Sequence, residues 1–349
     1  MVDSNARLLP LSFQGFKKTD SRGGLHWRIL ALVLGLLGGL LGILPLWAQP
    51  SSQSPKQIPA HFQANRIYVS PVTRGGDTLR LYTDTGGGKY PILTKQTADQ
   101  LELVPIDTLS QGRRSMPLVP FPDIRGRMSF PTPKANRALV LPRGRQTRLM
   151  DIEDGMLGQS WFAGRVWTFD YGSEKLRHHP RSQGVSFDTK HTVDLTFQSD
   201  STGRRTSHHP RIEATIADST YSFLFDTGAT SVLTDSARSA LDRPKRIGSS
   251  FVIASVFERW QRRHPEWKVV ERASVFTGGT PMIRVPEVGI AGHNVGPVWF
   301  ERRPDRNFKR GMARSMDRPV EGALGGSLFQ YFRVTVDYPE GRAYFERIK

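Results

Sequence analysis

The chain has 349 residues, with 49 Lys and Arg against 32 Asp and Glu, and a formal net charge of +17. It contains no cysteine, which excludes disulfides, thiolate zinc sites, iron–sulfur clusters, cysteine nucleophiles and a lipid-modified cysteine. The length is sufficient for two domains, and a hydrophobic content of 38% excludes a wholly disordered chain.

The N-terminal region predicts an export segment. Residues 1–28 carry five basic side chains, and residues 29–48 are apolar without any charge. This order is typical of a cytoplasmic N-terminus followed by a signal peptide or a membrane anchor. The apolar run is long enough to span a bilayer, whereas Leu46 is not the small residue that favours cleavage after Ala48. We expect an exported protein of the cell envelope or periplasm, either membrane-anchored or secreted after cleavage.

The remainder of the sequence predicts a mostly-β fold. Residues 49–65 are rich in Ser, Gln and Pro and predict a linker. Beyond them, short apolar runs alternate with Gly, Pro and Asp, as strands and turns do. Helical periodicity is restricted to short stretches, the best of which are 94–103, 234–242 and 254–262. The basic residues are dispersed without a nucleic-acid-binding motif, so we interpret them as a solvated surface and expect no nucleic-acid partner.

An internal repeat lies within this mostly-β region. Residues 155–171 align with residues 322–338 without gaps. The identical pairs are Gly155/Gly322, Leu157/Leu324, Gly158/Gly325, Ser160/Ser327, Phe162/Phe329, Thr168/Thr335, Asp170/Asp337 and Tyr171/Tyr338. Repetition over this length predicts that the chain contains two related lobes.

A second repeated element precedes each of these blocks. The tripeptide Asp-Thr-Gly follows an apolar, strand-like run at residues 84–86 and again at residues 226–228. Downstream, Leu93-Thr94 matches Leu233-Thr234, and Leu101 matches Leu241, after a two-residue length difference. The order Asp-Thr-Gly, then two apolar residues and Gly, then Asp-Tyr therefore occurs twice.

The repeated motifs resemble those of the aspartic proteases. Residues 223–233 (FLFDTGATSVL) and 322–338 are similar to a retropepsin-like domain, and two such lobes in one chain are similar to the pepsin-like arrangement. The resemblance implies two acid-protease β-barrel lobes, at 66–180 and 190–349, which follow the N-terminal hydrophobic helix at 29–48. It also implies an aspartic-type endopeptidase that hydrolyses peptide bonds of a polypeptide substrate without metal or cofactor.

The resemblance assigns Asp84 and Asp226 as the catalytic pair. The residues that would support the two catalytic turns are Thr85, Gly86, Thr227 and Gly228. A carboxylate on a tight turn after a buried strand is held rigidly at the edge of a lobe, and glycine permits close approach of a neighbouring segment. Two carboxylates that share a site hold one proton between them, because ionising both is costly. The ionised member can then deprotonate a water while the protonated member donates to the scissile carbonyl.

Lobe 1 departs from the family pattern after its Asp-Thr-Gly. Gly87 and Gly88 stand where lobe 2 has Ala229 and Thr230. Gly88 supplies no hydroxyl or carboxylate two residues after the Asp-Thr-Gly motif. Consecutive glycines also loosen the turn that holds Asp84. The two glycines therefore predict that Asp84 is positioned less precisely than Asp226.

Segments that could close over a peptide differ between the two lobes. Residues 276–280 are a Gly-rich hairpin tip in lobe 2, whereas residues 110–130 in lobe 1 contain no Tyr where a pepsin-like flap would carry one. No substrate-binding residue is assigned.

Two alternatives to a one-chain protease remain open. One is a peptide-binding protein that is catalytically impaired at Gly87-Gly88, and the other is a homodimer of two copies of lobe 2. The oligomeric state is left open.

Other polar residues have structural interpretations. Asp170 and Asp337 recur at matched positions before Tyr, which predicts a shared role such as a turn or hairpin bond. The histidine pairs at 178–179 and 208–209 lie in the polar junction 178–210 and lack the spacing of metal ligands. We expect both pairs to lie in solvated loops.

Overall fold

In the computed structural model, residues 51–349 form one compact unit. The structure describes residues 54–111, 114–126, 130–142, 144–179, 188–276 and 279–348. The expected export segment at 29–48 lies outside the described residues. Within the described ranges, no helix combines the length and the apolar character that crossing a bilayer requires.

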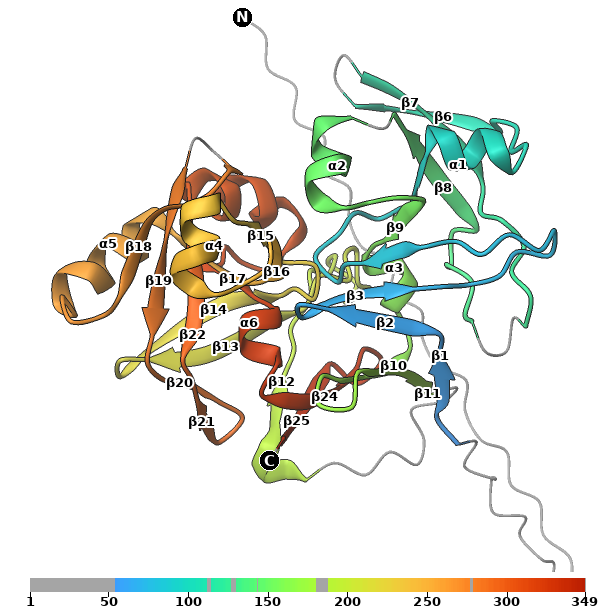
Figure 1. Cartoon of the computed structure of the whole chain (residues 1–349). Coiled ribbons are helices and arrows are strands. Elements are labelled where there is room, and N and C mark those ends of the chain that lie inside the picture. The colour runs from blue at the N-terminus through green and yellow to red at the C-terminus, as the bar shows by residue number, and fades with distance from the viewer. Residues whose placement is uncertain are drawn as a thin grey trace, which may run out of the picture. The chain divides into compact units, whose positions relative to one another are not determined.

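Lobe 1 is built on an eight-stranded sheet (Figure 1, blue to green). In sheet order the strands are β2 (Ala60–Gln63), β3 (Arg66–Val69), β4 (Leu81–Thr83), β9 (Gly155–Leu157), β5 (Ile92–Thr94), β8 (Arg137–Leu141), β7 (Arg114–Pro120) and β6 (Asp107–Gln111). Its helices are α1 (Lys95–Gln100), α2 (Arg145–Met150) and α3 (Gln159–Phe162). The antiparallel pair β6–β7 is a hairpin at the edge of this sheet.

Lobe 2 is built on a nine-stranded sheet (Figure 1, yellow to red). In sheet order the strands are β18 (Val269–Ser274), β19 (Thr280–Val285), β22 (Val298–Arg303), β17 (Ser250–Ile253), β23 (Gly322–Leu324), β14 (Ser219–Phe225), β13 (Arg211–Ile216), β20 (Val288–Ile290) and β21 (His293–Val295). A separate pair is β15 (Thr230–Val232) and β16 (Arg246–Gly248). The helices are α4 (Asp235–Leu241), α5 (Ala254–Arg263) and α6 (Gly326–Phe329), and two short helical turns are η3 (Asn307–Gly311) and η4 (Met312–Ser315). The three best stretches of helical periodicity in the sequence correspond to α1, α4 and α5.

A six-stranded sheet contains strands of both lobes and lies below them in Figure 1. In order its strands are β1 (Lys56–Ile58), β11 (Lys175–His179), β10 (Val166–Asp170), β24 (Phe332–Asp337), β25 (Arg342–Arg347) and β12 (Thr192–Asp194), which follows η1 (Thr189–His191). Strands β1 and β2 occupy residues 56–63, so the structure differs there from the linker expected at 49–65. Their apolar Ile58 and Phe62 are buried in the core.

The internal repeat corresponds to an internal two-fold axis at the centre of this shared sheet. Strand β10 of lobe 1 pairs antiparallel with β24 of lobe 2, and Thr168 lies directly opposite Thr335. The two hydroxyl oxygens are 2.8 Å apart. Since these threonines are equivalent in the repeat, the axis passes between them. Aromatic side chains of both lobes pack nearby, with Phe169 of lobe 1 and Phe225 of lobe 2 at 6.1 Å between ring centroids.

The two lobes share one arrangement of four strands. Strand β4 is parallel to β9, β9 antiparallel to β5, and β5 parallel to β8. In lobe 2 the same relations join β14, β23, β17 and β22. A Cβ added to Gly155 would lie 2.1 Å from the Ile92 carbonyl oxygen, and one added to Gly322 would lie 2.0 Å from that of Phe251. The counterpart of Ile92 is therefore Phe251, on β17.

This arrangement corrects one sequence match. Leu93-Thr94 aligns with Leu233-Thr234 by residue type, but the structural counterpart of β5 is β17, and residues 230–248 are an additional segment of lobe 2. The two Leu-Thr pairs share helix capping instead: Thr94 accepts a hydrogen bond from Thr97 N, and Thr234 accepts one from Ala237 N. The match indicates a common local structure rather than a common position in the fold.

The repeated aspartates that precede Tyr close equivalent hairpins. Asp170 Oδ1 accepts a hydrogen bond from the backbone of Ser173 at 3.0 Å, and Asp337 Oδ1 accepts one from Glu340 at 2.9 Å. Each bond spans the turn between the paired strands β10–β11 and β24–β25. The structural role predicted for both aspartates is confirmed.

Candidate active site

Asp84 and Asp226 occupy equivalent turns in the two lobes. Asp84 directly follows β4, and its backbone N–H donates to Leu157 O at 2.9 Å. Asp226 directly follows β14, and its N–H donates to Leu324 O at the same distance. Both aspartates are half-buried. The apolar-apolar-Gly segments of the repeat thus pack against the aspartate turns, as the sequence predicts.

The glycine of each turn touches the carboxyl group of the other lobe. A Cβ added to Gly86 would lie 2.7 Å from Cγ of Asp226, and a Cβ added to Gly228 would lie 2.2 Å from Cγ of Asp84. Both distances are shorter than any real Cβ contact. The structure therefore brings Asp84 and Asp226 together across the lobe boundary, and glycine is needed at both positions for this approach.

The two threonines of these turns bond reciprocally between the lobes. Thr85 N donates to Thr227 Oγ1 at 3.2 Å, and Thr227 N donates to Thr85 Oγ1 at 2.9 Å. The Thr85 hydroxyl also donates to Phe225 O at 2.8 Å. Both threonines are completely buried. Because buried polar groups are costly to leave without partners, these bonds hold the two turns in one relative position.

Burial raises the pKa values of both carboxyl groups, and the charge of Asp226 raises that of Asp84 further. For Asp84, burial is the largest cause, followed by the charge of Asp226 and a hydrogen bond between the two carboxyls, and its pKa lies well above the ordinary value. Burial also raises the pKa of Asp226, but the hydrogen bond from Asp84 and the N–H of Gly228 oppose the rise. Because Gly228 N donates to Asp226 Oδ1 while Asp84 Oδ1 accepts no hydrogen bond among the described residues, we assign the shared proton to Asp84 and the negative charge to Asp226.

This proton retention predicts that Asp84→Asn stabilises the protein at neutral pH. In the unfolded chain Asp84 releases its proton near pH 4, whereas the folded protein keeps it to higher pH, so stability falls as pH rises between these two pKa values. Asn carries no charge and avoids this cost. We expect the variant to unfold at a higher temperature than wild type at pH 7, by roughly 2–4 °C for each kcal/mol gained. The difference should vanish near pH 3.

Asp170→Asn is a control for which we expect the opposite change in unfolding temperature at pH 7. Burial opposes ionisation of Asp170, but hydrogen bonds from Ser173, Arg333 and Arg177 hold its pKa well below the ordinary value. Its ionised form therefore stabilises the fold above about pH 4, so this substitution should lower the unfolding temperature at pH 7. Thermal unfolding of the full-length variants from pH 3 to 7 measures both. A destabilised Asp84→Asn protein at pH 7 would contradict the proton assignment.

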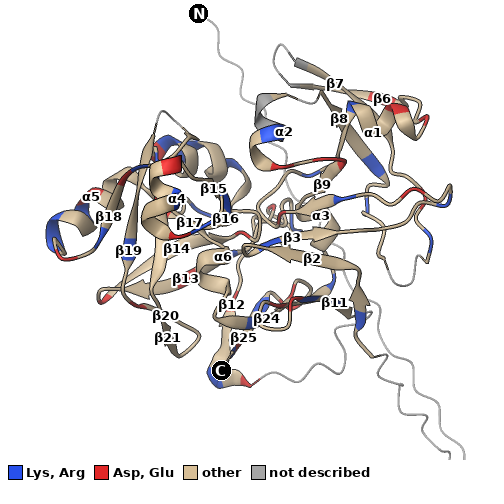
Figure 2. Ribbon diagram, in the orientation of Figure 1, with Lys and Arg blue, Asp and Glu red and all other residues tan. Residues whose placement is uncertain are grey.

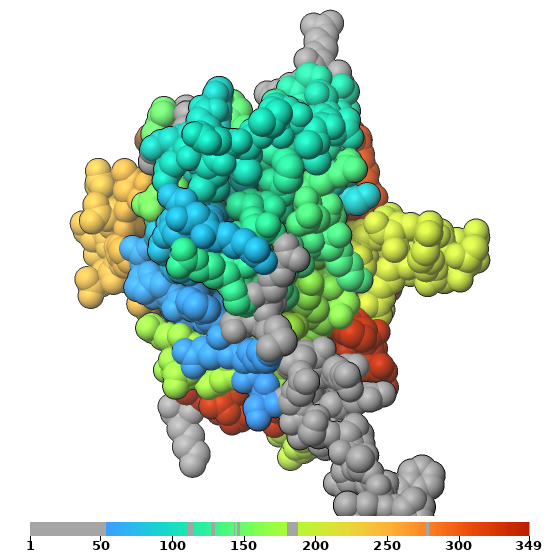
Figure 3. Space-filling view, turned by 90° about the vertical axis from the view of Figure 1, so that its right-hand side faces the viewer, coloured from blue at the N-terminus to red at the C-terminus, as the bar shows by residue number. Residues whose placement is uncertain are grey.

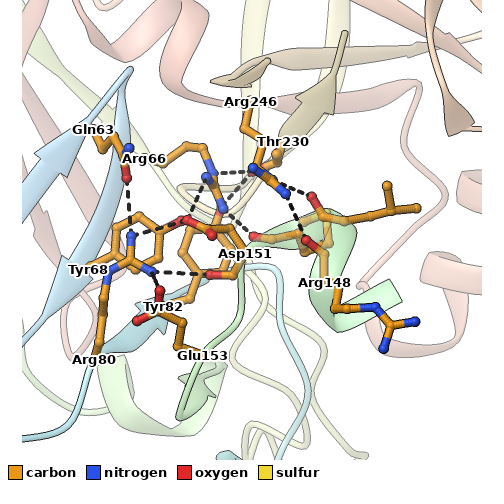
Figure 4. Close-up of polar contacts among 12 residues, drawn as sticks. Gln63, Arg66, Tyr68, Arg80, Tyr82, Arg148, Asp151, Glu153, Thr230 and Arg246 are labelled. Carbon is orange, nitrogen blue, oxygen red and sulfur yellow. Dashed lines mark hydrogen bonds and ion pairs between the residues drawn. The ribbon is translucent and has the colours of Figure 1, made fainter. Parts of the chain in front are cut away.

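A buried arginine braces the Asp226 turn from lobe 1 (Figure 4). Arg66 on β3 is 1% exposed, and its Nε donates to Thr230 Oγ1 at 3.2 Å, while Nη2 donates to Met150 O. The Tyr82 hydroxyl donates to Gly228 O at 2.8 Å and lies 2.7 Å from Thr230 Oγ1. The residues after Asp226 are thus fixed by side chains from the opposite lobe.

A buried histidine contacts the turn of Asp84, which the sequence did not predict. His209 is 5% exposed; its Nε2 lies 2.9 Å from Gly87 O and its Nδ1 lies 3.0 Å from Ser315 Oγ. Burial lowers its pKa, although the contact with Gly87 and the charge of Asp226 oppose this. His178 is buried too, on strand β11 beside Trp167. The expectation that both histidine pairs lie in solvated loops is therefore wrong.

The turn of Asp84 lacks a contact that the turn of Asp226 has. Asp226 Oδ1 accepts a hydrogen bond from Gly228 N at 2.9 Å, whereas Asp84 Oδ1 is buried without a partner among the described residues. A Cβ at Gly87 would lie 3.1 Å from Cγ of Asp84, while a Cβ at Gly88 would find only Tyr90 O, at 3.9 Å. The donor Gly228 corresponds to Gly86, so the glycines at 87 and 88 do not explain this difference, and the backbone N–H groups of Gly86 and Gly87 still act to lower the pKa of Asp84.

The strand beneath the lobe-2 hairpin carries a buried ion pair. Glu301 on β22 is completely buried and lies 3.2 Å from Arg303. Thr280, the first residue of β19, donates to Glu301 Oε1 at 2.8 Å. At the corresponding positions of lobe 1, strand β8 carries Leu139 and Leu141. Equivalent strands of the two lobes, β8 and β22, therefore carry chemically different side chains. Residues 277–278, in the expected hairpin tip at 276–280, lie outside the described residues.

The chain is similar in structure to an aspartic proteinase from Irpex lacteus, with 12% sequence identity and a TM-score of 0.48 over 85% of this chain and 98% of that one. It is similar to EDGP, with 10% identity and a TM-score of 0.44 over 85% of this chain and 96% of that one. No protein-family model and no curated protein sequence matches the chain.

Proposed function

We propose that the protein is an aspartic-type endopeptidase that uses Asp84 and Asp226 of one chain. The observation that carries the proposal is the reciprocal contact of the two turns, in which each glycine lies against the carboxyl group of the other lobe. Two half-buried carboxyl groups that share a proton are the groups that hydrolysis by an activated water requires. Thr85, Gly86, Thr227 and Gly228 position them and do not take part in proton transfer.

The hydrogen bond from Gly228 N to Asp226 Oδ1, which favours the charged form of Asp226, gives the two aspartates different roles. Ionised Asp226 takes a proton from a water bound between the carboxyls, and the water oxygen adds to the carbonyl carbon of the scissile peptide bond. Asp84 donates its proton to the carbonyl oxygen, which forms a gem-diol. When the gem-diol collapses, the C–N bond breaks, Asp226 gives the proton it took from the water to the leaving nitrogen, and Asp84 recovers a proton from one gem-diol hydroxyl, so both carboxyl groups return to their starting states. The chain's own residues complete this cycle without a covalent intermediate.

A peptide-binding protein on the same fold is the second candidate function. The Oδ1 atom of Asp84, which has no partner among the described residues, favours this candidate, because an oxygen atom without a fixed donor is less precisely positioned for proton transfer. A homodimer of lobe 2 is less well supported, because Asp226 already meets a carboxyl group of its own chain.

Cleavage of a random peptide library by the full-length protein, in mild detergent from pH 3 to 8, tests the proposal. Wild-type protein should cut and should be inhibited by a statine-type mimic of the gem-diol, which replaces the water between the carboxyls. Binding of peptides without cleavage at any pH, by protein shown to be folded, would contradict the protease and favour the second candidate.

The proposed site of action is outside the cytosol. The basic residues 1–28 and the uncharged run 29–48 support export, with the protein anchored in the membrane or released after cleavage near Ala48. N-terminal sequencing of the protein from envelope fractions distinguishes these two forms. Recovery of the intact chain from the cytosol alone would contradict export.

A further inference from the structure

A basic cavity of about 720 Å³ opens beside the turn of Asp84. Its wall is formed by Lys89, Lys134 and Gln159–Ser160 of lobe 1, residues 204–208 of the junction, and Arg314–Ser315 of lobe 2. In Figure 3 the junction segment near residue 200, in yellow, projects beside the green surface of lobe 1. The volume lies in the range of cavities that hold small organic ligands, and it is sufficient for amino-acid side chains.

The charge of the cavity is positive on every side. Five cationic side chains line it: Lys89, Lys134, Arg204, Arg205 and Arg314. No aspartate or glutamate is among its described lining residues. Arg204 pairs with Asp200 at 3.4 Å, and Arg205 donates to backbone carbonyls, but Lys89, Lys134 and Arg314 have no ion-pair partner in the described ranges. Lys and Arg also occur elsewhere on both lobes (Figure 2). What distinguishes the cavity is that cationic side chains from separate segments of the chain line the same space.

Two polar side chains of the wall lack hydrogen-bond partners. Ser160 is 8% exposed, and its hydroxyl has no partner among the described residues. The Nδ1 atom of His208 is also buried without one. Burial, with the charges of Lys134 and Arg205, lowers the pKa of His208 to about 4. Because both atoms are buried from solvent, the groups that an anionic ligand can reach are the cationic side chains of the wall.

The wall of the cavity is joined directly to the turn of Asp84. Gln159 N donates to Gly87 O, and Gly87 N in turn donates to Asp84 O at 3.0 Å. Lys89 belongs to the same turn. An extended peptide advances roughly 3.3–3.6 Å per residue, so a chain whose scissile bond lies at the two carboxyls reaches this wall within a few residues.

We propose that the basic cavity binds acidic side chains of the polypeptide substrate, a few residues from the scissile bond on the side of the Asp84 turn. The proposal rests on the proposed function, because it places a cleaved peptide across the two aspartates. Carboxylates form charge-assisted hydrogen bonds with Lys and Arg, which are stronger than bonds between neutral groups. The cavity thus makes acidic polypeptides the preferred substrate class.

Peptide binding to full-length Asp226→Asn protein tests the cavity without requiring cleavage. The probes are decapeptide pools with Glu fixed at one position and otherwise identical pools with Gln there. We expect Glu pools to bind about tenfold more tightly at one or more positions on one side of the pool centre, which corresponds to ~1.4 kcal/mol. Lys134→Gln with Arg314→Gln should remove the preference. Lys175→Gln with Lys245→Gln, exposed and outside the cavity, removes the same charge and should retain it.

The outcomes separate this inference from the protease function. Equal binding of Glu and Gln pools, or a preference that survives in the cavity variant, overturns the inference. If wild-type protein cleaves the library without enrichment of acidic residues, the protease function stands and the inference is wrong. If it cleaves nothing while the cavity variant alone loses the Glu preference, the cavity assignment stands for acidic peptides and the protease function fails.

Discussion

Replacing either aspartate of the pair by Asn is expected to lower peptide cleavage by at least about 10²–10⁴-fold, the usual contribution of a positioned acid or base. An amide in place of the Asp226 carboxylate could not accept the proton of the water, and an amide in place of the Asp84 carboxyl could not replace it as the acid that protonates the carbonyl oxygen. The two groups act as a unit, so the double variant should lose little more than either single variant. Initial rates on a peptide selected from the library, at the pH optimum of wild type, measure the loss.

The comparison of the two single variants also decides between one chain and two. Asp107 on β6 is exposed, so Asp107→Asn is a control for the same chemical change away from the site, and it should cleave at the wild-type rate. If Asp84→Asn retained full activity while Asp226→Asn lost it, and the protein were dimeric, two copies of lobe 2 would form the site. Activity in both variants would eliminate the pair as catalytic groups.

Gly228→Ala is expected to reduce cleavage by at least about 10²-fold although it leaves both carboxyl groups in place. The added methyl carbon would occupy a position 2.2 Å from Cγ of Asp84, so the carboxyl group of Asp84 must move. Displacement of a reacting group by about 1 Å is sufficient for a loss of this size. Cleavage rates, with the unfolding temperature measured beside them, distinguish a displaced carboxyl from an unfolded protein.

Gly88→Ala is the matched control for this substitution. Gly88 follows the other Asp-Thr-Gly, but a Cβ there would find its first neighbour at 3.9 Å, in ordinary contact. This variant should retain activity within a few-fold of wild type. Equal losses in the two alanine variants would show that glycine flexibility, rather than the contact between the turns, sustains the site. Wild-type activity in Gly228→Ala would show that the carboxyl group tolerates displacement.

The two aspartates of the site and their turns can be predicted from the sequence because both belong to the internal repeat. Asp84 and Asp226 can be paired by sequence alone, since each follows an apolar strand and precedes the same downstream block. The hairpin bonds of Asp170 and Asp337 are predictable for the same reason. A local pattern that occurs twice at matched positions indicates the same local structure in both lobes.

The features that escape the sequence depend on distant contacts. His209 has the polar neighbours of a loop residue, yet its partners Gly87 and Ser315 lie 122 and 106 positions away in the chain. The basic cavity likewise takes its cations from separate segments, of which Lys89 and Arg314 are the extremes. A real local similarity can also suggest a wrong structural alignment. The two Leu-Thr pairs both precede capped helices, but they do not lie on equivalent strands.

The threonine pair at the centre of the shared sheet has a consequence for the ancestry of the molecule. Equivalent residues that meet on a two-fold axis are the geometry of a symmetric dimer, in which Thr168 would have faced its own copy. In such a dimer every substitution appears on both sides. Once the halves are encoded separately, one can acquire Glu301 and Arg303 where the other keeps Leu139 and Leu141. Duplication and fusion thereby allow the two lobes to carry different side chains at equivalent positions of one symmetric framework.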